Sequence, residues 1–368
     1  MEVTDMIRIW SGAMRRKVLF AVICGLLFLG GTPAARAGDY AQPQEHDAVL
    51  KNFIFHSGEV FPELRVHYRT IGDPKGQPVL VLHGTAGTGQ SMLAPWFAAE
   101  LFGPGQPLDA RKYYIILPDA VGVGKTTKPS DGLRAKFPAY NYDDMVLAQY
   151  RMVVEGLGLK HLRLVLGHSM GGMQAWLWGV TYPEFMDAIV PMASQPTAMS
   201  SRNWMMRRMI TDAVRNDPAW KNGDYTEQPQ HFRLVNVYFN LATSGGSLAY
   251  QAKAPTRAKA DALLEGMLAK RTKMDANDFL YQWSSSADYD PSAKLDQIKA
   301  RVLVINAADD ERNPAESSLM RESLRRIPHA AYYLIPASAE TYGHGTTMHA
   351  KFWKKRLAAF LDELPRPR

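Results

Sequence analysis

The chain has 368 residues, of which 46% are hydrophobic, 28 are glycine and 23 are proline. This composition excludes collagen-like and intrinsically disordered proteins and supplies enough apolar residues for a full core. The net charge of +7 at pH 7 comes from scattered basic residues and not from a basic run interleaved with aromatic residues, so we expect no nucleic-acid partner.

The first 37 residues have the pattern of an export signal. A basic stretch at residues 15–17 precedes an apolar run at residues 18–29, and a small-x-small cleavage site ends at Ala37. The apolar run is too short for a typical transmembrane helix. We therefore expect cleavage after Ala37, a periplasmic or secreted protein, and no stable membrane insertion after cleavage. The alternative is an uncleaved segment that tethers the chain, and a translation start at Met14 would shorten the signal without removing it.

The single cysteine, Cys24, lies inside this signal. The mature chain would therefore contain no thiol and no disulfide, which excludes thiolate catalysis and metal sites built on cysteine. The ten histidines show no spacing typical of zinc ligands. We expect no metal and no cofactor.

The rest of the chain predicts strands that alternate with helices. Residues 52–55 and 63–70 are expected to form the first two strands. Continuous apolar runs then follow at residues 78–82, 113–117, 162–166, 188–192, 302–305 and 332–335, and helical patterns include residues 143–156 and 170–181. Apolar strands separated by helices indicate an α/β fold whose central sheet is mostly parallel and is flanked by helices on both faces.

This alternation stops between residues 196 and 290, where Met, Trp and charged residues occur at helical spacing. Because α/β sheets bind ligands at the carboxyl ends of their strands, an insertion at this point would lie over the binding site. We expect residues 196–290 to form a helical cap on one domain made of residues 38–195 and 291–368. A second independent domain is the alternative, although so few apolar runs would give it a thin core.

The strongest motif is Gly167-His168-Ser169-Met170-Gly171-Gly172, which follows an apolar strand directly and precedes a helical stretch. Glycines on both sides of the serine permit the sharp strand-to-helix turn that lifts a hydroxyl above the sheet. This nucleophile elbow predicts an α/β-hydrolase fold with Ser169 as the nucleophile.

A serine hydroxyl needs a base to take its proton, and the base needs a carboxylate to orient it. In this fold the acid precedes the histidine along the chain. Asp310 follows a predicted strand after a short turn, and His344 lies between two glycines after the last strand. We predict a catalytic triad of Ser169, His344 and Asp310, with Asp309 as the rival acid. His349 belongs to a helical pattern predicted at residues 348–361 and is expected to pack or to lie on the surface.

Two backbone N–H groups should face the oxygen that becomes negative in the tetrahedral intermediate. One is expected from Met170, the residue after the nucleophile, and the other from the loop after residues 78–82. In that loop Thr85 is the first choice and Ala86 the second. His83 is expected to brace the loop and to take no part in the chemistry.

Several short patterns extend beyond the elbow. They are Ser57-Gly58, Tyr68-Arg69-Thr70-Ile71-Gly72, Met145 and Gln149, Gly156-Leu157-Gly158, Ser169-Met170-Gly171-Gly172-Met173-Gln174-Ala175, Tyr182-Pro183, Asp217-Pro218 with Trp220, Gly223-Asp224-Tyr225, Asp275-Ala276-Asn277, and Asp310 with Pro314. With these patterns nearly all of the mature chain resembles the homoserine O-acetyltransferase family of α/β-hydrolase proteins. The resemblance implies an acyl-enzyme on Ser169, with the acid and the base at Asp310 and His344.

The chain departs from that family at two positions. The transferases usually carry glycine before the nucleophile, where this chain has His168, and aspartate after the base, where it has Gly345. Without that aspartate a charged contact to the amino group of homoserine is lost. An exported protein would also be separated from cytosolic acetyl-CoA. The missing aspartate and the predicted export therefore both favour water as the acyl acceptor.

We therefore predict a serine hydrolase that cleaves an ester or related acyl bond of a small-molecule substrate. Acyl transfer to a hydroxylated acceptor, as in the family that the chain resembles, is the first alternative. A non-catalytic binding protein on the same scaffold is the second. The identity of the substrate and the oligomeric state stay open, with a homodimer among the alternatives.

Overall fold

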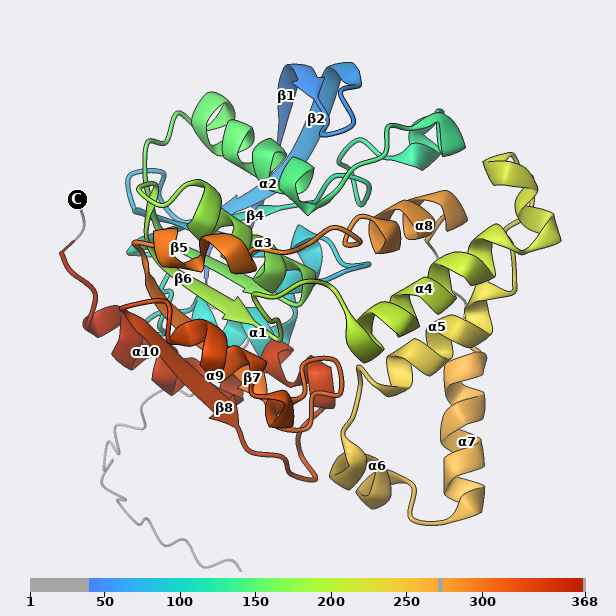
Figure 1. Cartoon of the computed structure of the whole chain (residues 1–368). Coiled ribbons are helices and arrows are strands. Elements are labelled where there is room, and N and C mark those ends of the chain that lie inside the picture. The colour runs from blue at the N-terminus through green and yellow to red at the C-terminus, as the bar shows by residue number, and fades with distance from the viewer. Residues whose placement is uncertain (1–39, 271–273, 367–368) are drawn as a thin grey trace, which may run out of the picture. The chain divides into compact units, whose positions relative to one another are not determined.

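The computed structural model describes residues 40–270 and 274–366 (Figure 1). The predicted export signal lies outside these residues. Within the described ranges no helix is both long enough and apolar enough to span a membrane.

An eight-stranded sheet forms the centre of the fold, in the order β1-β2-β4-β3-β5-β6-β7-β8. The strands are β1 (Gln44–Ile54), β2 (Val60–Ile71), β3 (Gln77–Leu82), β4 (Tyr113–Pro118), β5 (Leu162–His168), β6 (Met186–Met192), β7 (Arg301–Ala307) and β8 (Ala330–Ile335). β1 pairs with β2, and β2 with β4, in antiparallel fashion, while all pairs from β4 to β8 are parallel. The predicted α/β-hydrolase fold with a mostly parallel sheet is confirmed.

The prediction for the first strand is too short. It placed the strand at residues 52–55, whereas β1 begins at Gln44. In the added part only Ala48 and Leu50 are buried, and their neighbours are polar or exposed. An antiparallel strand at the edge of a sheet keeps one face in solvent, so it does not produce the continuous apolar run that marked the parallel strands.

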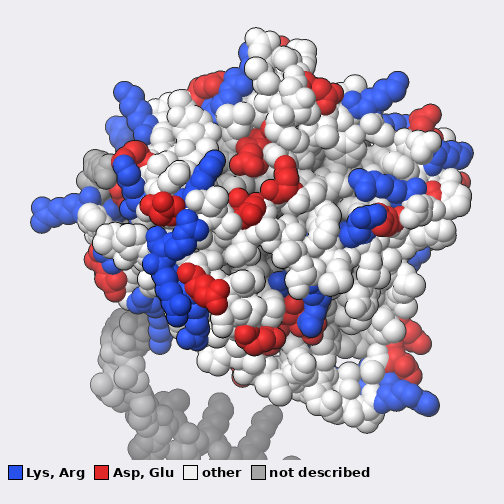
Figure 2. Space-filling view, in the orientation of Figure 1, with Lys and Arg blue, Asp and Glu red and all other residues white. Residues whose placement is uncertain are grey.

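Charged side chains of both signs are intermingled on the face of the molecule shown in Figure 2. Many basic side chains on the surface have an acidic neighbour, as in the pairs Lys51–Glu63, Arg202–Glu311 and Arg208–Asp212. Exposed pairs of this kind add little stability. In each pair, however, both charges stay in contact with water and each is balanced by its partner.

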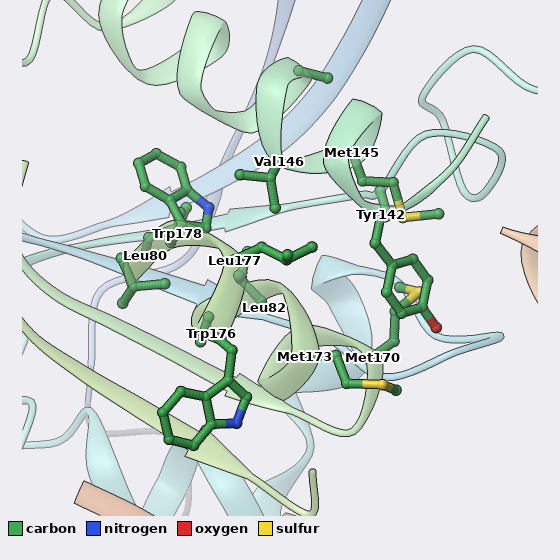
Figure 3. Close-up of a cluster of buried hydrophobic side chains, with 14 of the residues drawn as sticks. Leu80, Leu82, Tyr142, Met145, Val146, Met170, Met173, Trp176, Leu177 and Trp178 are labelled. Atoms are coloured by element: carbon green, nitrogen blue, oxygen red, sulfur yellow. The ribbon is translucent and has the colours of Figure 1, made fainter. Parts of the chain in front are cut away.

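Helices cover both faces of the sheet. Leu80 and Leu82 of β3 pack with α2 (Tyr142–Arg151) and α3 (Met170–Thr181), in the cluster drawn in Figure 3. Val79 and Val81, which alternate with them, pack with α1 (Pro95–Leu101) and α10 (Lys354–Asp362) on the opposite face. Because successive side chains of a strand point to opposite faces, one apolar strand serves both cores.

Two helix predictions have different outcomes. α3 has the predicted bounds, Met170–Thr181. The terminal helix, predicted at residues 348–361, begins only at Lys354, since 3-10 turns occupy Gly343–Met348 and Ala350–Phe352. The buried indole of Trp353 donates a hydrogen bond from Nε1 to the carbonyl oxygen of Thr347. This contact holds the tight turns together and keeps the segment around His344 compact.

The chain between β6 and β7, which we call the insertion, contains α4 (Ser201–Arg215), α5 (Phe232–Leu241), α6 (Ser247–Lys253), α7 (Arg257–Leu268) and α8 (Ala276–Ser284). Figure 1 shows these helices grouped on one side of the sheet. Part of the insertion has a hydrophobic cluster of its own, which includes Ile210, Phe232 and Trp283. Ser130, in the connection after β4, donates its backbone N–H and its hydroxyl to the carboxylate of Asp278 in α8. The insertion is thereby joined to the loops at the carboxyl ends of the strands.

Candidate active site

Ser169 lies at the corner between β5 and α3 with a φ of 55° and a ψ of −113°. A positive φ is unfavourable for a residue other than glycine, and it turns the hydroxyl out of the chain at this corner. The turn depends on close approach of backbones: a Cβ on Gly167 would lie 2.0 Å from the carbonyl oxygen of Gly171, and a Cβ on Gly171 would lie 2.3 Å from that of Leu82. The glycines of the motif therefore let α3 pack directly against the sheet.

Three residues that are far apart in the sequence form a continuous chain of hydrogen bonds. His344 Nε2 lies 2.7 Å from Ser169 Oγ, and His344 Nδ1 lies 2.8 Å from Asp310 Oδ2. All three side chains are buried. The structure thus brings together the nucleophile, base and acid predicted from the sequence.

The environment sets the charge of the acid and of the base. Burial alone would raise the pKa of Asp310, but the charge of His344 and hydrogen bonds from His344, Asn313 and the backbone of Arg312 lower it to about 2. Burial lowers the pKa of His344 and outweighs the opposing effect of Asp310. At neutral pH the acid is therefore ionised and the imidazole is neutral, as a general base requires.

Asp309, the rival acid, has a different set of contacts. Its Oδ2 accepts hydrogen bonds from Thr341 Oγ1 at 2.6 Å and from the backbone N–H of Gly343 at 3.3 Å. It therefore holds the loop that carries His344, while Asp310 contacts the imidazole itself.

The three amides predicted for the oxyanion hole are not equivalent. The N–H of Ala86 donates to Gln282 Oε1 of α8 at 2.6 Å. The N–H groups of Met170 and Thr85 have no acceptor within the described part of the chain. Of the two candidates in the loop after β3, Thr85 is thus the one whose amide is free for an oxyanion.

His83 braces that loop, as expected. Its Nε2 accepts a hydrogen bond from the N–H of Ala120 at 3.0 Å, so the ring proton lies on Nδ1, which donates to the carbonyl oxygen of Gly84 at 2.8 Å. His349 is a packing residue, because its ring stacks on Tyr342 with centroids 4.0 Å apart. In the described part of the chain, the ring that hydrogen-bonds to Ser169 Oγ is that of His344 and not that of His83 or His349.

The model of the alpha/beta hydrolase fold family matches residues 77–341 of the chain. The chain belongs to the alpha/beta hydrolase fold family.

Relatives of this α/β-hydrolase-fold protein include transferases. It is 27% identical over 275 residues to a probable acyltransferase of Methanothermobacter thermautotrophicus, covering 73% of this chain and 83% of the relative. It is also 27% identical over 358 residues to a homoserine O-acetyltransferase of Citrifermentans bemidjiense, covering 84% and 94%. A match to the homoserine O-acetyltransferase of Deferribacter desulfuricans is 34% identical but spans 47% of this chain and 50% of that protein. The predicted resemblance to the homoserine O-acetyltransferase family is confirmed.

Solved structures agree in fold. The acetyl esterase MekB superposes with a TM-score of 0.74 at 22% identity, covering 87% of this chain and 97% of MekB. A homoserine O-acetyltransferase from Bacillus anthracis superposes with a TM-score of 0.73 at 21% identity, covering 88% and 98%. At these identities the likeness shows the fold, and it does not choose between the two activities.

A cavity of about 600 Å³, which we call the Ser169 pocket, opens at Ser169 of this α/β-hydrolase-fold protein. Its lining includes Ser169 and His344, Thr85 from the loop after β3, Ser130 from the connection after β4, Phe239 of α5 and Trp283 of α8. Its volume suits a small molecule. The insertion therefore supplies much of the wall that a substrate would meet.

The pocket has two further lining residues whose positions the sequence did not indicate. His168 lies next to the nucleophile, its Nδ1 2.7 Å from Thr347 Oγ1, and burial lowers the pKa of the ring well below its usual value, so it is neutral. Arg312 lies two residues after the acid and lines the same pocket although it is only 6% exposed. The sequence did not indicate that Arg312 is buried in the pocket, because most arginines lie on the surface.

Proposed function

We propose that the protein is a serine hydrolase that cleaves an ester or related acyl bond through an acyl-enzyme on Ser169. The observation that carries the proposal is the pair of hydrogen bonds from Ser169 Oγ to His344 Nε2 and from His344 Nδ1 to Asp310 Oδ2, at 2.7 and 2.8 Å. The relatives, which are esterases and acyltransferases, support an enzyme of the hydrolase and acyl-transfer class.

The geometry supports a two-step reaction. In the first step His344 Nε2 takes the proton of Ser169 as Oγ attacks the carbonyl carbon, and ionised Asp310 stabilises the imidazolium that forms. The free amides of Met170 and Thr85 donate to the oxyanion. His344 then protonates the departing alcohol. In the second step it activates a water that attacks the acyl group and frees Ser169.

Water is the proposed acceptor because of the residue that follows the base. The N–H of Gly345 donates to the carbonyl oxygen of Thr243 at 2.7 Å, and a Cβ at this position would lie 3.0 Å from the same oxygen. The position where the transferases carry aspartate thus has no carboxylate and little room for one. An amino-acid acceptor would lack its charged partner here.

Acyl transfer to an alcohol is the second candidate, favoured by the acyltransferase and homoserine O-acetyltransferase relatives. The purified protein should be given 4-nitrophenyl acetate with and without homoserine, glycerol and ethanol, and its products quantified. We expect acetate to be the main product in every case. Turnover that requires an alcohol and releases negligible acetate would replace hydrolysis by transfer.

A non-catalytic role on the same scaffold is tested at the nucleophile. A fluorophosphonate probe should label the folded protein at Ser169, and Ser169→Ala should abolish labelling. Folded wild-type protein that the probe leaves unmodified would favour a binding protein.

We propose further that the mature protein begins after Ala37 and is periplasmic or secreted. The pattern of a basic stretch, an apolar run and a small-x-small site supports this localisation. The N-terminal sequence of protein recovered from periplasm or medium should start at Gly38. Protein retained in the membrane with its first residues intact would support the tethered alternative.

A further inference from the structure

The guanidinium of Arg312 is a buried cation without a carboxylate partner. The residue is 6% exposed, and its guanidinium carbon lies 3.4 Å from the ring centroid of Phe239. Nη2 donates to the carbonyl oxygen of Phe239 at 3.1 Å and to Thr243 Oγ1. Across residues 40–270 and 274–366, no carboxylate oxygen lies within ion-pair distance of this side chain.

The remaining donors of Arg312 are unused. Its Nε is buried without an acceptor in the described ranges, and Nη1 makes no hydrogen bond to any residue of them. Asp310, two residues away, is committed to His344, Asn313 and the backbone N–H of Arg312. Other arginines, such as Arg69 and Arg163, also have a buried Nε without an acceptor, but each of them has a carboxylate partner, which Arg312 lacks.

The charge of Arg312 is only partly compensated. Burial lowers the pKa of the guanidinium well below its usual value, against the opposing attraction of Asp310. Because a guanidinium keeps its proton near neutral pH, the protein bears the cost of a charge that has left water. Surface arginines such as Arg202 and Arg208 have acidic partners, and the face in Figure 2 intermingles both signs.

The position of Arg312 connects this charge to catalysis. Arg312 lines the Ser169 pocket together with Ser169, His344 and Phe239. A small anion in that pocket would lie beside the Arg312 side chain, whose Nε and Nη1 have no acceptor in the described ranges, and guanidinium donors match the geometry of a carboxylate. Desolvation by the pocket makes such a contact stronger than one on the surface.

We propose that Arg312 binds a carboxylate of the substrate, so that the preferred ester carries a free carboxylate group. The inference rests on the proposed hydrolytic function and names the substrate class of the same pocket. The carboxylate is part of either the acyl group or the alcohol, and both arrangements present the same chemistry to Arg312.

Two matched pairs of esters test the proposal and distinguish these arrangements. Monomethyl glutarate carries the carboxylate on the acyl part and is compared with its amide, methyl glutaramate. Acetoxyacetate carries it on the alcohol part and is compared with acetoxyacetamide. We expect the wild-type protein to favour the carboxylate over the amide at least tenfold in kcat/KM for one pair.

The same ratio should depend on Arg312. Arg312→Gln should reduce it at least tenfold. Arg208→Gln, which removes a charge from an exposed arginine of α4, should leave it unchanged. A wild-type ratio near or below one in both pairs, or a ratio that Arg312→Gln does not alter, would overturn the proposal.

If Arg312→Gln does not fold, inhibition of the wild-type protein tests the proposal instead. Glutarate should inhibit hydrolysis of 4-nitrophenyl acetate competitively, with an inhibition constant at least tenfold lower than that of glutaramide, and equal constants would contradict the proposal. If no ester were turned over and Ser169 resisted the fluorophosphonate probe, the proposed function would fail. Calorimetric binding of glutarate and glutaramide to the Ser169→Ala protein would then still decide whether the pocket takes an anion.

Discussion

The members of the proposed triad would contribute through different atoms, so substitutions should separate their roles. Ser169→Ala removes the nucleophile and His344→Ala the base, and each should lower kcat for 4-nitrophenyl acetate by about 10⁵- to 10⁶-fold. Circular dichroism should show that both variants stay folded. Loss of only tenfold in Ser169→Ala would mean that the ester is cleaved by other groups.

The two adjacent acids allow a sharper test. Asp310→Asn should lower kcat by about 10⁴-fold, because an amide facing Nδ1 favours the wrong imidazole tautomer. Asp309→Asn should cost less than about tenfold, since an amide oxygen can still accept the hydrogen bond from Thr341 Oγ1. A damaging Asp309→Asn beside a mild Asp310→Asn would reverse the assignment of the acid.

Activity should persist into mildly acidic solution. The base works only when it is neutral, and burial lowers the pKa of His344 below the ordinary value of 6.5. Activity is therefore lost as the pH falls through this lowered pKa, while Asp310, with a pKa of about 2, stays ionised throughout. The acid limb of kcat/KM for a neutral ester should lie below pH 6.5, and a limb above pH 7 would contradict the pKa direction.

At the scale of elements, the strand-to-helix corner depends on close contact between α3 and β3. Gly171→Ala would place a Cβ 2.3 Å from the carbonyl oxygen of Leu82, which is backbone and cannot turn aside. We expect a loss of about 1–3 kcal/mol in the free energy of unfolding and weaker probe labelling of Ser169, measured by thermal denaturation and active-site titration.

Gly266 provides the matched control for that substitution. It lies in α7, and a Cβ there would have no heavy atom within 4 Å. Gly266→Ala should raise the free energy of unfolding by up to about 1 kcal/mol, because alanine favours a helix more than glycine does. If both variants were equally destabilised, tight packing at the elbow would not be the cause.

Local patterns account for the part of the fold that the sequence predicted correctly, because the parallel strands contain continuous apolar runs. The triad is a prediction from a glycine-framed serine and a fixed chain order. The choice between Asp309 and Asp310 depends on contacts from a distant loop, in which His344 faces Asp310 while Thr341 and Gly343 donate to Asp309. Whether Arg312 has an ion-pair partner depends in the same way on elements that are remote in sequence, and in the described ranges none of them places a carboxylate within ion-pair distance of it.

At the scale of the whole molecule, the stability that the contact between the insertion and the core contributes should depend on pH through Asp278. Burial raises the pKa of this carboxyl to about 6, although Ser130 donates two hydrogen bonds to it. The folded protein therefore binds a proton more tightly than the unfolded chain. The stabilising contribution is full below the ordinary pKa of 3.8 and is lost as the pH rises through about 6.

Asp278→Asn isolates this contribution, because asparagine can still accept the hydrogen bond from the Ser130 N–H and does not titrate. Between pH 7.5 and pH 5 the Tm of the wild-type protein should rise relative to that of Asp278→Asn by about 2–4 °C. Glu265→Gln, an exposed change in α7, should track the wild type at every pH. If the wild-type Tm instead falls relative to that of Asp278→Asn as the pH decreases from 7.5 to 5, the carboxylate is stabilised in the folded state. That result would contradict the raised pKa of Asp278.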